Sequence, residues 1–439
     1  MISRRSFLGK AAAGAALATI PGIFPKTVLS AVKEPSDAAA GLSSFAKKGM
    51  RGAADDESFW KAVQQSFSVD RSLMHLNNGG VCPAPVVVQE AEKAHLAEFH
   101  RSPFYSLQSA VRPQIESVRS QLAECLGCDS EEIAFTRNTS EGMEIVQLGI
   151  RLNPGDEILT TSQDYPRMLR TWEQRIKRDG IVLKKIDIPV PLVDAGVLVD
   201  RFRSQITPKT RLIMCCHMID LTGQILPIKE ICAEAHANDI LVLVDGAQTF
   251  AQVPFNLREL GCDFFATSLH KWMMGPQGTG LLFVRKNLIP SIWPLMSASA
   301  DLSADIRKFE DIGTTPPSRI LSLGEAIAFH HQIGAARKEK RLSYLRDFWL
   351  NQLLRFDRIV LKTNTKTAAS LATVDVEGID PVALRDFLWE IHRIRVRPIR
   401  TDQVTGIRAS ASVYTSKYEL DRFINTMENV IRYGIPKTS

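Results

Sequence analysis

The feature that most constrains the fold is a series of short apolar runs between about Glu131 and Val284. They read EIAFT, DEILTT, VLKKIDI, TRLIMCCH, DILVLVD, CDFFATS and GLLFVR, and longer amphipathic segments separate them. Apolar runs of strand length between helical patterns are typical of a largely parallel sheet covered by helices, as in an α/β domain. Ligands bind such sheets where the strands end, so functional residues are expected there.

A second, smaller set of elements follows. After Ser318 the pattern is helical, and LATVDVE, RIRVRPI and GIRASASVY then predict short strands around the helical segment DPVALRDFLWEI. The last helix has the apolar spacing of one buried face, at Leu420, Phe423, Ile424, Met427 and Ile431. We therefore predict a large α/β domain over residues 57–330 and a smaller α+β domain over residues 331–439.

The N-terminus has the features of an export signal. Arg4 and Arg5 precede an uncharged stretch, Ala11 to Pro25, that is rich in alanine and glycine. It resembles a twin-arginine signal, which is read by export machinery that carries folded proteins, and it is too short for a stable membrane span. A disordered basic N-terminus is the alternative. We expect a signal peptide over 1–31, a linker over 32–56 and a periplasmic or other extracytoplasmic location.

Charge and cysteine content argue against two other classes of protein. The formal net charge is +6, but the first 31 residues carry four basic side chains and no acid, so the rest carries only +2. That balance gives no argument for nucleic-acid binding. The sequence CLGC at 125–128 has no second pair at zinc-site spacing, and Gly127 is more simply interpreted as the end of a helix. We predict no metal site.

The segment ILVLVDGAQ places a carboxylate at the end of an apolar strand. Asp245 would be buried there, and a buried carboxylate is costly unless a cation or a hydrogen-bond donor meets it. An internal salt bridge is one interpretation. The other is the ring nitrogen of a pyridine cofactor, which an acid keeps protonated and able to withdraw electrons. In that case Gln248 would reach the phenolic oxygen of the cofactor.

Two further motifs would complete such a site. In FTRNTSEGMEIV, Thr139 and Ser140 lie where a strand gives way to a helix whose N-terminus suits a phosphate, although an ordinary helix cap is the commoner case. In SLHKWMMGPQGTG, Lys271 has the position to form a Schiff base, with Ser268 and His270 as phosphate anchors. A solvated loop lysine is the alternative. The order of phosphate turn, aspartate and lysine within one sheet favours the cofactor.

Together these motifs resemble a known family. NTSEG, VDGAQ and SLHKWMMGPQGTGLLFV, with GQILPI before the last and EDIGT and GIRASASVY after it, resemble the class V aminotransferase group of pyridoxal 5′-phosphate (PLP) enzymes. This group includes isopenicillin N epimerase-like proteins and cysteine desulfurases and has the fold of type I PLP enzymes. The resemblance runs from about Asn77 to near the C-terminus.

The resemblance implies a role for each motif residue. Lys271 would bind the cofactor and move the α-proton, and Asp245 would pair with the pyridine nitrogen. Tyr165 would stack on the ring. The residues that would hold the cofactor's other groups are Gln248, at the phenolic oxygen, and Thr139, Ser140, Ser268 and His270, at the phosphate.

The resemblance also implies a substrate site and a partner. Arg408 matches the arginine that takes the substrate α-carboxylate. Gly313 and Thr314 match a loop that reaches the phosphate of a neighbouring subunit, which implies a homodimer. His217 is a candidate pocket residue, and a strand-end histidine satisfied by the backbone is nearly as good an interpretation.

Three features depart from the pattern or add to it. No cysteine follows Cys262, which argues against a desulfurase, because that chemistry needs a cysteine just before the substrate arginine. Asp220 stands where desulfurase-like members often have asparagine, and no role is assigned to it. Strand alternation would aim Arg393, Arg395 and Arg397 at one face, toward a second acidic group or, more simply, along a solvated edge strand.

We expect a PLP-dependent aminotransferase acting on a small-molecule or peptidic amino-acid substrate through Lys271. Epimerisation or racemisation, as in isopenicillin N epimerase-like proteins, and a lyase reaction are the alternatives. A non-catalytic exported binding protein of the same fold is a further one. A dinucleotide-binding protein built on GPQGTG ranks below these, because its glycines precede a strand instead of following one.

Overall fold

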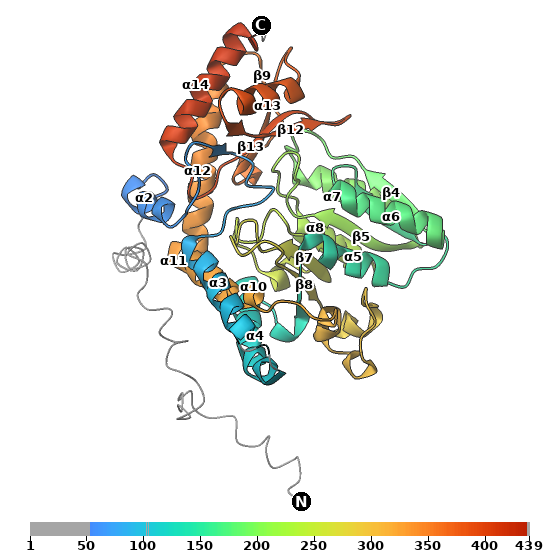
Figure 1. Ribbon diagram of the computed structural model, residues 1–439. Helices are drawn as coiled ribbons and strands as arrows, with labels where there is room; N and C mark the ends of the chain where they lie inside the picture. The colour runs from blue at the N-terminus through green and yellow to red at the C-terminus, as the bar shows by residue number, and fades with distance from the viewer. Residues whose placement is uncertain (1–52, 102, 104, 437–439) are drawn as a thin grey trace, which may run out of the picture. The chain divides into compact units, whose positions relative to one another are not determined.

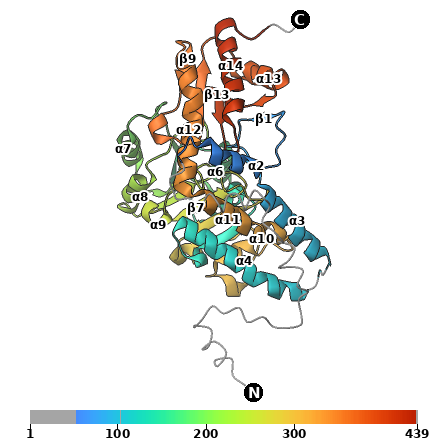
Figure 2. The ribbon, with the colours of Figure 1, turned by 90° about the vertical axis from the view of Figure 1, so that its left-hand side faces the viewer.

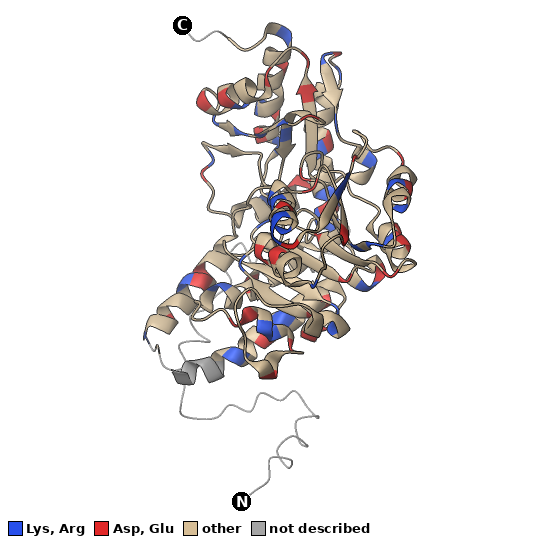
Figure 3. Cartoon of the chain, turned by 90° about the vertical axis from the view of Figure 1, so that its right-hand side faces the viewer, with Lys and Arg blue, Asp and Glu red and all other residues tan. Residues whose placement is uncertain are grey.

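The computed structural model describes residues 53–101, 103 and 105–436. The predicted signal at 1–31 and most of the linker at 32–56 lie outside these residues. Within the described part of the chain, no helix has the length and apolar character needed to cross a membrane. Figure 3 shows basic and acidic residues interspersed along the helices on the face in view.

The seven apolar runs form one seven-stranded sheet, as predicted (Figure 1). Its order is β2-β8-β7-β6-β5-β3-β4. Strand β8 runs antiparallel to both of its neighbours, and the pairs between β7 and β4 are all parallel. The strands are β2 (Ile133–Thr136), β3 (Glu157–Thr161), β4 (Val182–Ile186), β5 (Thr210–Cys216), β6 (Leu241–Asp245), β7 (Phe264–Ser268) and β8 (Gly280–Val284).

Both faces of this sheet are buried, because alternate residues of one strand enter different hydrophobic clusters. Leu243 and Phe264 pack on one side, while Val244 and Phe265 pack on the other. Two helices contribute to the first side, namely α5 (Thr139–Gly149) and α6 (Pro166–Asp179). Those on the second side include α7 (Ala195–Gln205), α8 (Ile228–His236), α9 (Leu257–Leu260), α10 (Ser318–Leu321) and α11 (Leu323–Ile333).

The N-terminal described segment also joins the second cluster. It contains α2 (Glu57–Gln65), β1 (Met74–His75), α3 (Val86–Arg101) and α4 (Tyr105–Leu126). Helix α4 ends at Gly127, which has φ +67°, and a short 3-10 turn, Ser130–Glu132, leads into β2. The interpretation of CLGC as a helix end is therefore confirmed. Three further 3-10 turns, Lys286–Ser291, Ala300–Leu302 and Ile306–Glu310, follow β8.

The C-terminal elements build a separate four-stranded antiparallel sheet of order β12-β13-β10-β9. Its strands are β9 (Ile359–Leu361), β10 (Leu371–Val376), β12 (Arg397–Arg400) and β13 (Thr405–Ser410). Its core also takes residues from α12 (Ala335–Leu353), α13 (Pro381–Glu390) and α14 (Lys417–Tyr433), and α12 lies beside α14 in Figures 1 and 2. All five apolar residues predicted for the last helix are buried there.

Two predictions about this region need comment. The run RIRVRPI is not one strand: β11 (Ile394–Arg395) pairs with β1, whereas β12 belongs to the four-stranded sheet. The chain therefore changes sheet at Val396, so Arg397 is not on the same strand as Arg395. Arg393 and Arg395 both lie over the Trp389 ring, and a face shared with Arg397 stays a prediction. The described residues belong to one compact unit, and the predicted division at residue 330 falls inside α11. That boundary remains a prediction.

Candidate active site

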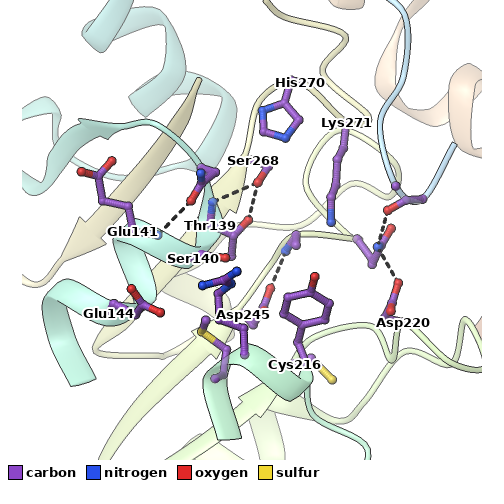
Figure 4. Close-up of a pocket in the computed structure, with 18 of the residues that line it drawn as sticks. Thr139, Ser140, Glu141, Glu144, Cys216, Asp220, Asp245, Ser268, His270 and Lys271 are labelled. Carbon is purple, nitrogen blue, oxygen red and sulfur yellow. Dashed lines mark hydrogen bonds between the residues drawn. The ribbon is translucent and has the colours of Figure 1, made fainter. Parts of the chain in front are cut away.

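A cavity of about 620 Å³ lies at the carboxyl ends of the parallel strands, where the α/β pattern places it (Figure 4). It is large enough for a cofactor and a substrate. The cavity brings together most of the residues singled out from the sequence: Thr139, Ser140, Tyr165, Asp245, Gln248, Ser268, His270 and Lys271.

The N-terminus of α5 forms one end of the cavity. Its cap is Asn138, whose side chain accepts a hydrogen bond from the Glu141 N–H at 2.9 Å. The hydroxyl of Thr139 is therefore not used as the cap and lies 2.7 Å from Oγ of Ser268, which also accepts from the Thr139 N–H at 2.9 Å. The hydroxyls of Thr139 and Ser140 and the positive end of a helix suit a phosphate.

Lys271 follows β7 and extends its amino group into the cavity (Figure 4). Burial lowers its pKa, and the carboxylates of Asp220 and Asp245 oppose that shift. Partial burial and a place in the cavity wall disfavour the solvated loop lysine considered as an alternative, and the role of Lys271 stays a prediction. A buried amine with a lowered pKa is more easily deprotonated, which is what a nucleophilic lysine requires.

Asp245 ends β6 with 8 % of its surface exposed. Its Oδ1 accepts a hydrogen bond from the Ala247 N–H at 2.9 Å, and no described cationic side chain forms a salt bridge with it. Burial raises its pKa to about 6. A buried carboxylate that faces the cavity and forms no salt bridge with a described side chain fits a protonated pyridine nitrogen, so the residues present fit PLP.

Gln248 lies beside this carboxylate, and its side chain is fully engaged. Its Nε2 donates to the carbonyl of Gly79 at 2.8 Å and to Oδ1 of Asp220 at 3.0 Å, while its Oε1 accepts from Trp272 at 3.0 Å. To donate to a phenolic oxygen, the amide must give up one of those two acceptors. That role for Gln248 stays a prediction.

Tyr165 stands at the start of α6, lines the cavity and is 42 % exposed. The preceding residue holds it in place: the buried Asp164 carboxylate accepts from Thr160, from Thr161 and from the Cys216 N–H at 2.6 Å. These bonds tie the end of β3 to the end of β5. A tyrosine ring at this position can cover one face of a planar cofactor.

Arg408 is the predicted carboxylate-binding residue, and it is fully buried behind the cavity wall. Its Nη1 donates to the backbone carbonyl of Asp220 at 2.8 Å and to the Asp220 carboxylate, and its Nη2 donates to Asn77 at 2.6 Å. Arg397 also pairs with Asp220, and unlike Arg408 it lines the cavity. The sequence motifs assign no role to Asp220 and place Arg397 among several arginines of one run.

Three other predicted residues are not brought to the cavity. The ring of His217 packs edge-on against Phe255, with centroids 5.0 Å apart, and its Nδ1 has no partner among the described residues. Cys216, the residue before it, lines the cavity, because successive strand residues point to opposite faces. Gly313 and Thr314 lie in an exposed loop away from the cavity in this chain.

Comparison with known proteins gives a consistent result. The family described as "Aminotransferase class-V" matches residues 77–423. Isopenicillin N epimerase of Amycolatopsis lactamdurans is 27% identical over 84% of this chain and 98% of its own length. A probable cysteine desulfurase of Methanothermobacter thermautotrophicus is 26% identical over 85% of this chain and 98% of its own length.

Solved structures share the fold. A mutant of C-DES with glycine covalently linked to its PLP cofactor superposes with a TM-score of 0.75, at 25% identity, over 83% of this chain and 98% of that chain. The apo structure of a cysteine desulfurase from Thermococcus onnurineus has a TM-score of 0.75 at 24% identity, over 85% and 98%. The family match, the fold of type I PLP enzymes and a cavity that fits PLP agree. The chain belongs to the class V aminotransferase family, whose cofactor is PLP.

Proposed function

We propose that this protein is an aminotransferase that removes the amino group of an amino acid or an amino-acid-containing metabolite. The observation that carries the proposal is the pair formed by the half-buried Lys271 and the buried Asp245, two groups of opposite charge that face one cavity from consecutive strand ends. Lys271 is the amine that would hold PLP through its aldehyde, and Asp245 would accept the pyridine N–H. PLP supplies an electron sink for the bonds at the substrate α-carbon.

The other residues of the cavity would hold and orient the cofactor. The N-terminus of α5, with Thr139 and Ser140, would bind the phosphate, and Ser268 lies within hydrogen-bond distance of Thr139 at the same point. The Nδ1–H of His270 donates to the Thr279 carbonyl at 3.1 Å, so Nε2 would donate to the phosphate only in the protonated ring, whose pKa burial lowers. Tyr165 would cover the ring and limit the access of water.

Lys271 also has the position to move a proton. Burial lowers the pKa of Lys271, so a neutral Nζ would be available as the base that takes the α-proton of a bound substrate. Where the proton goes next decides the reaction. Delivery to the cofactor side gives transamination, and delivery to the opposite face of the α-carbon gives epimerisation.

Epimerisation is the second candidate, and one observation favours it. Two isopenicillin N epimerases, from Amycolatopsis lactamdurans and Streptomyces clavuligerus, are each 27% identical to this chain along 98% of their own lengths. The chain also has no cysteine after Cys262, which disfavours a desulfurase that places its cysteine just before the substrate arginine. An amino acid or peptide substrate is common to both candidates.

An absorbance spectrum of the purified holoenzyme tests the proposal. A panel of L- and D-amino acids should convert the band of lysine-bound PLP durably to that of pyridoxamine phosphate with one or more donors. If no donor converts the band but exchange of the α-hydrogen with D₂O is seen by NMR, the reaction is epimerisation. Purified protein that neither carries nor takes up PLP would refute both and favour the non-catalytic binding protein.

We also propose a dimer and an export route. The exposed loop with Gly313 and Thr314 would complete the phosphate site of a second copy, as in the family pattern. Sedimentation of the holoenzyme should therefore give twice the chain mass. The twin-arginine stretch at Arg4 and Arg5 would direct the folded protein across the membrane, and replacing both with lysine should leave the protein in the cytoplasm on cell fractionation.

A further inference from the structure

The backbone turn that carries Lys271 has a strained shape. The Met274 N–H closes it by donating to the Lys271 carbonyl at 3.0 Å. A second bond runs from the Gly275 N–H to the Leu269 carbonyl at 2.8 Å. Met274 has φ +60°, a left-handed conformation that is costly for a residue with a side chain. Such a turn keeps its shape only where its surroundings fix it.

The peptide carbonyls on either side of Lys271 are tied to distant parts of the chain. The His270 carbonyl accepts from the Cys82 N–H at 3.1 Å, in the segment before α3. The Trp272 carbonyl accepts from Nζ of Lys338 on α12. Trp272 is fully buried, and no other donor of the described residues reaches its carbonyl. The side chain of Lys338 therefore satisfies a group that would otherwise be left without a hydrogen bond.

Lys338 is a costly residue to place there. Its side chain has no exposed surface, and it forms no salt bridge with a carboxylate of the described residues. Arg341, one turn further along α12, is equally buried but pairs with Glu57. A buried amine without a counter-ion is less stable than an apolar side chain of the same size. The contact with Trp272 is thus the one interaction of the described chain that the amine of Lys338 gains in return.

The surroundings of Lys338 allow an uncharged amine near neutral pH. Burial lowers its pKa to about 7, against a smaller opposing effect of Cys82. His330 on α11 also faces it, and burial lowers the pKa of His330 as well, so that ring is neutral and offers no counter-charge. An amine donates N–H groups whether or not it is protonated. The bond to the Trp272 carbonyl therefore does not depend on the charge of Lys338.

We propose that Lys338 is a positioning residue for Lys271: it holds the Trp272 carbonyl and so fixes the turn that aims the Lys271 amine into the cavity. The inference rests on the proposed function only in taking Lys271 as the amine that binds the cofactor. Lys338 does not line the cavity, so it acts on Lys271 through the backbone. Without it, the turn should open more often, and Lys271 should meet the cofactor aldehyde less often.

Amide hydrogen exchange of the purified protein tests the hold on the turn. Lys338→Met keeps an unbranched side chain of similar length and removes the donor. The peptide that contains Met274 and Gly275 should then exchange about 10-fold faster, as expected for the loss of one buried hydrogen bond. Lys340→Met is the matched control, because it removes an exposed lysine of the same helix and should change this exchange less than about twofold. Peptides from β5 and β6 report any change in global stability.

Covalent attachment of PLP tests the consequence for Lys271. PLP is removed from the proteins and added back, and the link to Lys271 is trapped with borohydride over time. Lys338→Met should slow this attachment about 10-fold, and Lys340→Met should not. Non-covalent PLP binding, measured by dialysis in proteins that also carry Lys271→Ala, should differ less than about twofold with and without Lys338→Met. A merely structural role of Lys338 would not separate attachment from binding in this way.

Two results would overturn the inference. One is exchange of the Met274 peptide that stays at the wild-type rate in Lys338→Met, and the other is attachment that slows no more than in Lys340→Met. Lys338→Leu removes the same donor with a different shape, and it replaces Lys338→Met if that variant does not fold. Failure of both to fold would also count against the inference, because Lys338 would then be required for the fold and not for the turn.

Uptake of PLP by the wild type is read separately. Protein that takes up no PLP but shows the expected exchange in Lys338→Met would refute the aminotransferase proposal and leave the hold of Lys338 on the turn standing. Wild-type protein that attaches PLP, with equal attachment rates in Lys338→Met, would refute the inference and leave the proposed function standing.

Discussion

The buried carboxylate of Asp245 predicts that the cofactor site is unstable without its cofactor. The side chain is 8% exposed and lacks a cationic partner among the described residues, and burial raises its pKa from 3.8 to about 6. A difference of about two pKa units corresponds to about 3 kcal/mol, at about 1.4 kcal/mol per unit. The apo protein therefore carries this cost whenever Asp245 is ionised.

The sign of the pH dependence follows from these values. Because the folded-state pKa lies above the unfolded value, the folded protein binds this proton more tightly. Its stability should fall as the pH rises from about 4 to about 6, and the cost is fully present above that range. Asp245→Asn removes the charge and keeps an oxygen for the Ala247 N–H, while its amide needs a new acceptor at a cost of about 1 kcal/mol. We expect the variant to be more stable by about 2 kcal/mol at pH 8.

Thermal unfolding of the apo proteins measures this effect. PLP is first removed from both proteins, and the midpoints are compared at pH 8 and near pH 4. The midpoint of Asp245→Asn should exceed that of the wild type at pH 8, and the gain should vanish near pH 4. A variant that is less stable at pH 8, or a gain that is equal at both pH values, would refute the reasoning.

A second buried aspartate provides the matched control. Asp164 also lies at a strand end, but backbone N–H groups donate to both of its oxygens, from Thr161 to Oδ2 and from Cys216 to Oδ1. In either orientation, the amide group of Asn would face one of these donors. Asp164→Asn should therefore lose about 2 kcal/mol or more at pH 8. In the holoenzyme, Asp245→Asn should lower kcat about 10-fold or more, because the partner of the pyridine nitrogen is lost.

Three further substitutions test other parts of the site. Lys271→Ala should abolish the borohydride-reducible attachment of PLP and leave the circular dichroism unchanged, and covalent cofactor in the variant by mass spectrometry would contradict the assignment. Tyr165→Ala should weaken PLP binding about 5-fold in equilibrium dialysis, whereas Tyr165→Phe keeps the ring and should bind normally. Gly246→Ala would place Cβ 1.9 Å from the Phe265 ring and should lower stability by about 2 kcal/mol, while Gly324→Ala, with its nearest atom 3.9 Å away, should not.

Local sequence determined the strands of the large sheet and the edge of the sheet where the cavity lies. The seven apolar runs became seven strands of one sheet, because each run is long enough for a strand and all except the edge strand β4 are largely buried. Asp245, Lys271 and Thr139 meet in one cavity for a simple reason: each follows a strand, and the carboxyl ends of parallel strands share one edge. The spacing along the chain was enough to predict that meeting.

The substrate end of the cavity could not be predicted in the same way. Asp220 lies 177 residues from Arg397 and 188 from Arg408 along the chain, and no local pattern links them. Their contact depends on the register of β12 with β13 and on how this small sheet meets the segment after β5. Alternation alone grouped Arg397 with Arg393 and Arg395 on one strand, whereas the structure divides this run between two sheets at Val396.

The contrast has a physical basis. Residue types and hydrophobic periodicity act over one or two turns or strands, so the sequence by itself determined the elements, the sheet and the cofactor-binding edge. Burial, access and charge balance depend on which distant side chains pack together. Only the tertiary structure therefore decided that Arg408 is buried behind Asp220, that Gln248 is already hydrogen-bonded, and that Arg397 faces the cavity.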